Sequence, residues 1–303
     1  MHEWDREVDV LVVGTGAAGL TAAITAADAG RSRVFSVPAA GGEVRRLDAK
    51  SRGVYAGIQA AGGNLVARWE SSASPAEVVK VNPQGGHSAL SAFNADRIAG
   101  VDMPAFREFW FESSKGRRIH SWLALPPGFD EDEKYPLVLQ IHGGPFSSSM
   151  DAGHVRWNAH LLAAPGYVVM LTDYTGSVGY GEQFSRNIHR DPLKTPGEEL
   201  LEAAAVAIER FPFIDGARQA ATGASYGGHL VNWLQATTTH FKALVGHAGL
   251  EVGLVLHAAA EPGIVAVDHR RHQLARPLLP GVDPLPAPLA VQFLGDPPEG
   301  LGD

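Results

Sequence analysis

The spacing of hydrophobic and polar residues predicts two kinds of structure, one after the other along the chain. An apolar run at residues 8–13, a glycine-rich turn at 14–19 and an alanine-rich segment at 20–29 predict a strand, a turn and a helix. Short β-like runs separated by glycine and asparagine follow at residues 34–37, 53–57, 64–69 and 77–81. Such runs suit turn-linked strands, as in one or two blades of a β-propeller, fewer than the four that a closed propeller needs.

From residue 109 onward, apolar strand-like runs alternate with helical segments. The predicted strands cover residues 109–112, 119–125, 137–142, 168–174, 219–223 and 243–247, and the predicted helices cover 155–163, 196–210 and 227–237. This alternation indicates an α/β fold with a mostly parallel sheet, preceded by a small β-rich region. Residues 251–303 differ in composition, because they hold eight of the 20 prolines and no Ser, Thr, Lys or Asn.

We therefore expect four segments. These are a strand-turn-helix at 1–32, a propeller-blade-like region at 33–107, an α/β core at 108–250 and a proline-rich segment of uncertain structure at 251–303.

Composition narrows the class of protein. A chain of 303 residues with 45% hydrophobic residues can bury a sizeable core. The net charge of -8 argues against a nucleic-acid partner, and the lack of cysteine excludes disulfides, thiolate metal sites and a cysteine nucleophile. The acidic start lacks the basic region of a signal peptide, and the apolar run at 8–13 is too short for a bilayer. We expect a cytoplasmic protein without a membrane partner.

A serine in a tight glycine turn is the first candidate for chemistry. Residues 223–227 read Gly-Ala-Ser-Tyr-Gly, which fits G-x-S-x-G between an apolar strand and a predicted helix. In that context the motif forms a nucleophile elbow, whose glycines prevent a collision between a Cβ and neighbouring backbone. The N-terminus of the following helix then faces the reacting centre. Ser225 is the predicted nucleophile.

A second glycine motif ends an upstream strand. Residues 140–145 read Gln-Ile-His-Gly-Gly-Pro, an arrangement that leaves backbone N–H groups free to face a tetrahedral oxyanion. Gly143 or Gly144 is the expected first donor and the N–H of Tyr226 the second, each worth about 3 kcal/mol in comparable sites. Positions 143 and 225 lie 82 residues apart, which leaves room for β-α-β units between them.

Residues 109–250 resemble the catalytic domain of the prolyl oligopeptidase family, in particular its dipeptidyl-peptidase V and acylaminoacyl-peptidase members. The stretches that carry the resemblance are residues 142–145, 173–181, 211–215, 223–229 and 241–245. The resemblance implies an α/β-hydrolase fold behind propeller blades. It also exposes a departure at Thr175, where the family usually carries arginine. Loss of that cation would loosen the loop or change how the end of the substrate is recognised.

Ser225 also needs a histidine to accept its proton and a carboxylate to orient that histidine. In α/β-hydrolases the acid and then the histidine follow the serine in the chain. Asp296 ends an apolar run 71 residues after Ser225, so the resemblance implies Asp296 as the acid. None of the seven residues after Asp296 is a histidine, and the base must therefore be sought elsewhere.

Several histidines could replace the missing base. His269 and His272 form the densest group after the nucleophile and are the first candidates, with Asp268 or Asp283 to orient them. The alternatives are His247 and His257. We expect His229, on the helix after the elbow, to be a packing residue, and His142 to shape the oxyanion loop.

The sequence predicts neither a metal nor a cofactor. His269 and His272 stand three apart with no thiolate and no HExxH pattern, so zinc is not expected. Residues 3–19, with their G-x-G-x-x-G turn, resemble the N-terminus of FAD-dependent dehydrogenases of the fumarate reductase and ketosteroid dehydrogenase type. Ser36 stands where a dinucleotide site needs an acid for the ribose, so we interpret the segment as structural. A flavin oxidoreductase remains an alternative that yellow protein would support.

The sequence predicts a serine hydrolase that forms an acyl-enzyme on Ser225. The short β-rich region favours an open site for small acyl esters, with short peptides as the close alternative for the substrate. A different class is a mosaic or truncated hydrolase that lacks the base and has a binding role or none. We expect an edge strand of the sheet to be left unpaired, and an unpaired edge favours dimerisation or aggregation. Besides the substrate, the partner that we expect is therefore a second copy of the chain in a homo-oligomer.

Overall fold

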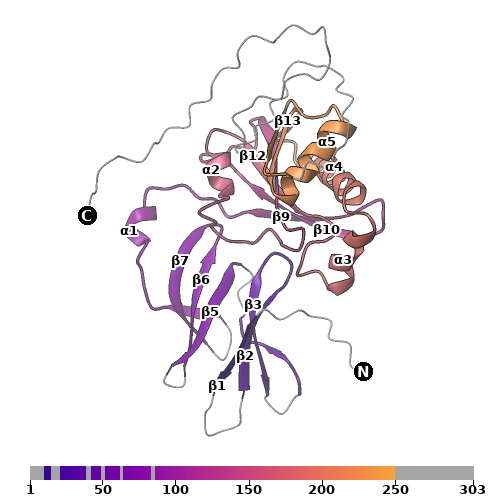
Figure 1. Cartoon of the computed structure of the whole chain (residues 1–303). Helices are drawn as coiled ribbons and strands as arrows, with labels where there is room; N and C mark the ends of the chain where they lie inside the picture. Colours follow the sequence, from indigo (N-terminus) through magenta and orange to yellow (C-terminus); the bar gives the residue numbers. More distant parts are fainter. Residues whose placement is uncertain are drawn as a thin grey trace, which may run out of the picture. The chain divides into compact units, whose positions relative to one another are not determined.

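The structure is a computed structural model that describes residues 10–14, 21–38, 42–48, 52–61, 64–82 and 86–249 (Figure 1). Its strands form three sheets. The first sheet has the order β1-β2-β3-β4, with β1 (Val10–Gly14), β2 (Thr21–Ala27), β3 (Ser32–Pro38) and β4 (Arg45–Arg46). The second has the order β5-β6-β7-β8, with β5 (Val54–Ala61), β6 (Asn64–Ser71), β7 (Ser74–Val81) and β8 (His87–Ala89).

Both N-terminal sheets are antiparallel meanders of four strands, the arrangement of a propeller blade. They share one hydrophobic core. Val34 of β3 belongs to the same buried cluster as Tyr55 and Ile58 of β5 and Val79 of β7. The β-like runs expected between residues 34 and 81 are therefore strands, and they close a core of their own.

The helix predicted at residues 20–29 is wrong. This segment forms β2, which pairs antiparallel with β1 on one side and with β3 on the other. Helix propensity is worth only tenths of a kcal/mol per alanine, whereas two neighbouring strands satisfy the backbone of β2 on both edges. The first sheet also runs across the segment boundary expected at residue 32.

A six-stranded sheet in the order β14-β13-β11-β12-β10-β9 supports the candidate site. Its strands are β9 (Arg107–Glu112), β10 (Arg118–Ala124), β11 (Tyr135–Ile141), β12 (Val168–Asp173), β13 (Ile214–Ala224) and β14 (Ala243–His247). The four strands β11 to β14 are parallel, and β9 and β10 form an antiparallel edge. This confirms the predicted α/β-hydrolase-like, mostly parallel sheet behind a β-rich region.

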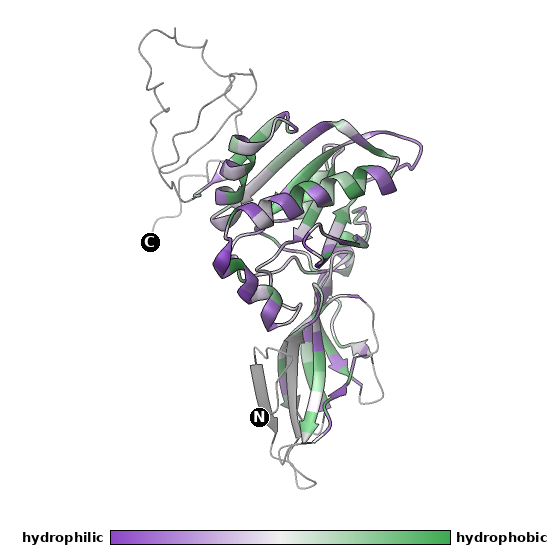
Figure 2. Cartoon of the chain, turned by 90° about the vertical axis from the view of Figure 1, so that its right-hand side faces the viewer, coloured by the Kyte–Doolittle hydropathy of each residue, from purple (hydrophilic) through white to green (hydrophobic). Residues whose placement is uncertain are grey.

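Helices cover both faces of this sheet. On one face, α4 (Lys194–Arg210) and α5 (Tyr226–Thr237) pack on Leu123, Leu139 and Met170. On the other face, α2 (Ala159–Ala163) packs on Trp122 and Val169. Adjacent strand residues thus alternate between two cores, as strand geometry requires. Figure 2 shows hydrophobic residues concentrated in the strands of this sheet and mixed with hydrophilic ones along the helices.

The shorter helices lie at element junctions. They are α1 (Ala95–Ile98), α3 (Glu182–Arg186) and the 3₁₀ helix at Asn187–Arg190. The helix expected at 155–163 begins only after Asn158, because the Asn158 side chain caps it by accepting from the N–H groups of His160 and Leu161.

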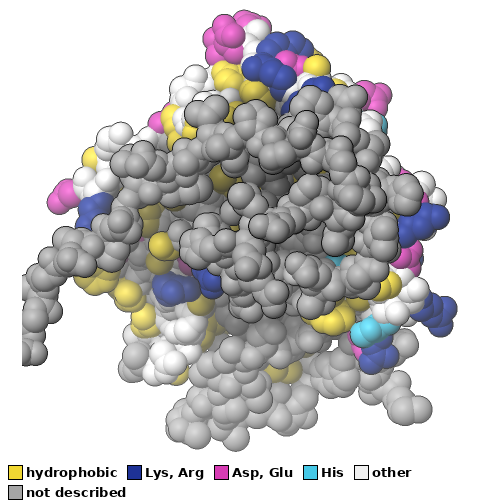
Figure 3. Space-filling model, turned by 45° about the horizontal axis from the view of Figure 1, so that its top comes forward, with side chains coloured by type: hydrophobic (Ala, Val, Ile, Leu, Met, Phe, Trp, Pro, Cys, Tyr) yellow, Lys and Arg dark blue, Asp and Glu magenta, His cyan; other side chains and the backbone are white. Residues whose placement is uncertain are grey.

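Two surface observations bear on partners. In the described residues, no helix is both long and apolar enough to cross a membrane. On the face shown in Figure 3, the visible Lys and Arg side chains are interspersed with Asp and Glu and do not form one basic patch.

Candidate active site

Ser225 occupies the junction between β13 and α5, where the sequence predicted an elbow. Its backbone has φ 56° and ψ -120°, a region that side-chain-bearing residues rarely adopt. Ser225 is also the N-cap of α5, so the free N–H groups and positive end of that helix lie at this residue. The serine is therefore held at the tip of a strained turn.

The glycines on both sides of Ser225 are required by close backbone contacts. A Cβ on Gly223 would lie 2.6 Å from the carbonyl oxygen of Gly227. A Cβ on Gly227 would collide with the carbonyl oxygen of Ile141 and lie 2.9 Å from that of His142. The elbow thus packs directly on the end of β11.

The register of the sheet brings the second motif to the elbow. Ile141, the last residue of β11, pairs with Gly223 of β13. A Cβ on Gly143 would lie 2.9 Å from the carbonyl oxygen of Ala224 and 3.4 Å from the Cβ of Ser225. Gly144 has φ 127°, which only glycine adopts readily. The structure therefore brings Gly143, Gly144, Ser225 and Tyr226 together, and their role as an oxyanion hole stays a prediction.

His142 is fixed as a structural part of the loop at residues 142–147. Its ring stacks on Tyr174 with centroids 4.4 Å apart, and its Nε2 lies 2.9 Å from Ser177 Oγ. The Tyr174 hydroxyl donates to the His142 carbonyl oxygen at 2.7 Å. Burial lowers the pKa of His142, so the ring is neutral at pH 7. This agrees with the expected role in shaping the loop.

His247 is the candidate base that lies within the described residues, as does His229, which the sequence predicts to be a packing residue. His247 ends β14, and its carbonyl oxygen accepts from the Ser225 N–H at 2.9 Å. Its ring faces Trp157 at 6.3 Å between centroids. The His229 ring lies 6.0 Å from that of Tyr226.

The remaining triad candidates lie outside the described residues. They are Asp296, His269, His272, His257, Asp268 and Asp283. The structure thus places Ser225 and the glycine loop, and the roles of nucleophile, acid and base stay predictions.

Comparison with known proteins assigns the segment around this site. The model of the prolyl oligopeptidase family matches residues 153–259. The chain contains a prolyl oligopeptidase family domain. Dipeptidyl-peptidase 5 of Schizosaccharomyces pombe is 37% identical over 153 residues, which are 50% of this chain and 22% of that protein. The probable dipeptidyl-peptidase 5 of Emericella nidulans is 33% identical over 257 residues, covering 82% of this chain and 35% of that protein.

Solved structures give the same result. The acylaminoacyl peptidase of Pyrococcus horikoshii matches with a TM-score of 0.69 and 26% identity, over 81% of this chain and 38% of that one. The dipeptidyl peptidase 4 of Porphyromonas gingivalis has the same fold, with a TM-score of 0.65 and 23% identity. The chain spans 35% or less of the length of the two curated relatives described above.

A second family model, an FAD binding domain, matches residues 9–101. The structure does not fit that cofactor. A dinucleotide site needs a helix N-terminus after the glycine turn and a parallel strand beyond it. Here the segment after the turn is β2, antiparallel to both neighbours. In the described residues, no group of three or more His, Asp or Glu side chains could hold a metal.

Behind the loop at residues 142–147, Asp173 is a buried residue that sequence reasoning did not single out. Its Oδ1 accepts from the Ser149 N–H at 2.7 Å and lies 3.6 Å from His142 Nε2. Its Oδ2 accepts from the Tyr180 hydroxyl and lies 3.5 Å from His120 Nδ1. The position of Asp173 at the carboxyl end of a parallel strand is a signal that could have identified it.

An ion network continues from Asp173 to the N-terminal region. His120 Nε2 lies 3.2 Å from Glu108 Oε1, and Arg31 pairs with Glu108 at 2.5 Å. Burial alone would lower the pKa of His120, but its bonds with Asp173 and Glu108 raise it above the usual value. The bond from His120 and the pair with Arg31 hold the pKa of Glu108 below its ordinary range. When it is protonated, His120 lies between two carboxylates.

Thr175 stands where the family usually carries an arginine, and neighbouring side chains contact it. The Thr175 N–H and Oγ1 both donate to the buried Glu199, at 2.7 and 2.8 Å. Arg117 Nη1 lies 3.2 Å from Thr175 Oγ1 and 3.5 Å from Glu199. The hairpin between β9 and β10 thus brings a guanidinium to this position, and the effect of Thr175 on the loop stays a prediction.

Proposed function

We propose that the prolyl oligopeptidase domain of this chain is a serine peptidase site with Ser225 as its nucleophile. The observation that carries the proposal is Ser225 in a left-handed conformation at the strand-to-helix turn, with Gly143 packed against it. A strained residue at such a turn is typical of a functional site, because packing must offset its cost. The relatives described above are named as peptidases, which supports peptide bonds over the small esters favoured by the sequence.

The geometry suits acyl transfer. Ser225 Oγ attacks the carbonyl carbon of the scissile bond, and its proton passes to a histidine. The carbonyl oxygen becomes an oxyanion that accepts from the N–H of Tyr226 and from that of Gly143 or Gly144. The histidine then protonates the leaving amine, and water releases the acyl group from Ser225 by the same steps. We assign the base to His269 or His272 and its orienting acid to Asp296, with His247 and His257 as the further candidates.

The names of the relatives also suggest the substrate class. Dipeptidyl and acylaminoacyl peptidases remove a short unit from the N-terminal end of a peptide, so we propose a short peptide as substrate. An ester of the same acyl group would also react, since its leaving group needs less protonation than an amine.

The test measures hydrolysis by three proteins: the wild type, Ser225→Ala and the control Ser114→Ala. Ser114 is an exposed serine on the β9–β10 turn. The substrates are an N-acetyl-aminoacyl p-nitroanilide and an unblocked dipeptidyl p-nitroanilide, with a short-chain p-nitrophenyl ester alongside. We expect at least one anilide to be cleaved, with a loss of at least about 1000-fold in Ser225→Ala only. Turnover of the ester alone would favour an esterase, and equal turnover in all proteins would overturn the proposal.

A further inference from the structure

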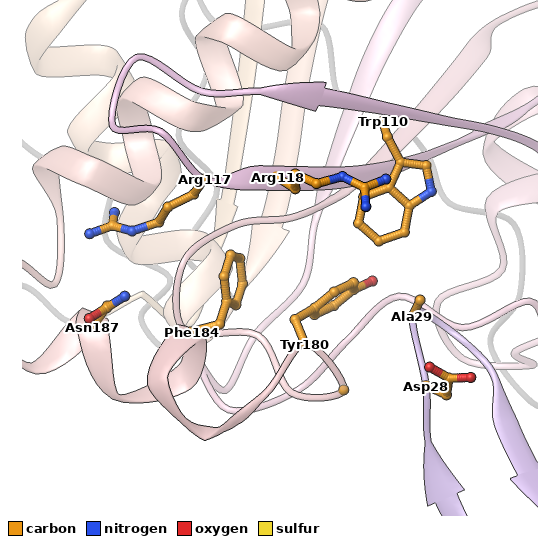
Figure 4. Close-up of a pocket in the computed structure, with 9 residues that line it drawn as sticks. Asp28, Ala29, Trp110, Arg117, Arg118, Tyr180, Phe184 and Asn187 are labelled. Atoms are coloured by element: carbon orange, nitrogen blue, oxygen red, sulfur yellow. The ribbon is translucent and has the colours of Figure 1, made fainter. Parts of the chain in front are cut away.

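A cavity of about 410 Å³ lies beside the hairpin that joins β9 to β10. Its lining comes from that hairpin, from the turn at residues 28–29 and from residues 179–187, all within one compact unit. No residue of the elbow or of the 142–147 loop lines it. Figure 4 shows two arginines and three aromatic rings around this cavity, which we call the hairpin pocket. Peptide cleavage on Ser225 makes no use of these side chains.

Arg118 provides a positive charge at the wall of the hairpin pocket. Its guanidinium lies over the Trp110 ring, 4.7 Å from the centroid, and the residue is exposed. Trp110 is itself fixed, because its ring stacks on that of His120 with centroids 4.5 Å apart and its Nε1 donates to Glu108 at 3.1 Å. Among the described residues Arg118 has no ion pair. Stacking leaves the edge of the guanidinium, with its N–H donors, free for an anion.

The walls next to Arg118 are aromatic. The rings of Tyr180 and Phe184 lie 5.4 Å apart, and that of Trp110 meets Tyr180 edge-on at 5.8 Å. The Tyr180 hydroxyl is already engaged, because it donates to Asp173 and lies 2.6 Å from His120 Nδ1. Tyr180 therefore offers its ring to the pocket, and the three rings form an apolar surface suited to a flat or hydrocarbon group.

The other charges limit how anionic a ligand can be. Arg117 also lines the hairpin pocket, but its Nη1 already contacts Thr175 and Glu199. The opposite end carries the carboxylate of Asp28, which lies 4.0 Å from Arg33 Nε. Arg118 can therefore pair with one negative charge of a ligand, and the carboxylate of Asp28 repels any further negative charge. A ligand with a single negative charge fits these groups better than a polyphosphate does.

We infer that the hairpin pocket binds a small organic carboxylate with an aromatic or hydrocarbon body. Arg118 receives the carboxylate through its paired N–H donors, and the rings of Trp110, Tyr180 and Phe184 receive the body. Two sources offer a carboxylate with such a body: a free aliphatic or aryl acid, and the C-terminal residue of a peptide. The inference holds whether or not Ser225 is catalytic.

The experiment is an NMR titration of the full chain with 3-phenylpropionate as the probe. Its uncharged analogue 3-phenylpropanamide tests the need for the carboxylate, and acetate tests the need for the ring. A peptide ending in Phe, with a free or an amidated C-terminus, distinguishes the two sources of the ligand. We expect saturable binding of the carboxylates with ring-bearing bodies, at least tenfold tighter than of the amides or acetate.

Variants locate the binding. Arg118→Gln should weaken the binding of 3-phenylpropionate at least tenfold. The affinity of Arg118→Lys should lie between those of the wild type and Arg118→Gln, because lysine keeps the charge but not the planar pair of donors. The matched control is Arg156→Gln, since exposed Arg156 also lies near a tryptophan ring, at 5.9 Å from Trp157, outside the pocket. Arg156→Gln and Ser225→Ala should bind as the wild type does. Binding that survives Arg118→Gln, binding lost in Ser225→Ala, or no saturable binding would each overturn the inference.

Discussion

At the scale of single residues, the site depends on glycines that have no Cβ as much as on the hydroxyl of Ser225. Ser225 is one of three non-glycine residues with positive φ in the described part of the chain, and such a conformation costs of order 1–3 kcal/mol. The cost is tolerated because Gly223, Gly227 and Gly143 let three backbone segments meet around the serine. The motif is therefore a packing requirement as well as a chemical one.

Gly227→Ala tests this requirement. The added methyl group would collide with the carbonyl oxygen of Ile141, so we expect a loss of about 1–3 kcal/mol in the free energy of unfolding. Urea denaturation measures it. The control is Gly100→Ala, where a Cβ meets nothing within 4 Å and the change should stay within about 0.5 kcal/mol. Equal stability of the two variants would show that the elbow is not closely packed.

At the scale of elements, the ion network of Arg31, Glu108, His120 and Asp173 joins β9, β10 and β12. The folded protein holds the pKa of His120 above 6.5. Its protonation therefore stabilises the fold fully below pH 6.5, and this contribution is lost as pH rises through the raised pKa. Burial lowers the pKa of His142, so its titration acts in the opposite direction, and it is common to the wild type and a His120 variant.

The measurement is urea unfolding of the wild type and His120→Gln at a series of pH values from 6 upward. We expect the stability difference between the two proteins to shrink as pH rises. Glu108 is ionised across this window, so its titration does not obscure the result. A difference that stays constant with pH would show that folding does not raise the pKa of His120.

The strands of the parallel sheet were predictable from the sequence, and strand β2 was not. Strands such as β11 and β14 are apolar runs bounded by turns, and burial on both faces leaves little ambiguity. The alanine-rich segment of β2 carries no such constraint, so only its pairing with β1 and β3 decided its structure. The same holds for the site, since the elbow is a local motif, whereas Asp173 and His120 meet only after folding.

At the scale of the whole molecule, Asp151 connects the segment after the 142–147 loop to the second N-terminal sheet. Its fully buried carboxylate accepts from the Gly53 N–H at 2.7 Å, the Ser72 N–H at 3.0 Å and the Ser72 hydroxyl at 2.6 Å. The Asp151 N–H donates to Gly30 at 2.8 Å. The blade-like sheets thus help to position the loop that faces Ser225.

Asp151→Asn should therefore destabilise the chain by about 1–3 kcal/mol, because an amide nitrogen would face donors that the carboxylate now satisfies. Thermal and urea unfolding measure the loss. Asp132→Asn is the matched control at an exposed position and should change stability by no more than about 0.5 kcal/mol. If the two variants are equally stable, the N-terminal sheets do not hold the loop through Asp151.

The central claim is that Ser225 is an activated nucleophile, and covalent labelling tests it most directly. The full chain is treated with a fluorophosphonate, an electrophile that reacts with activated serines, and the modified peptide is identified by mass spectrometry. We predict a single adduct on Ser225 that is absent from Ser225→Ala and retained in Ser114→Ala. No adduct, or an adduct on another serine that persists in Ser225→Ala, would contradict the account.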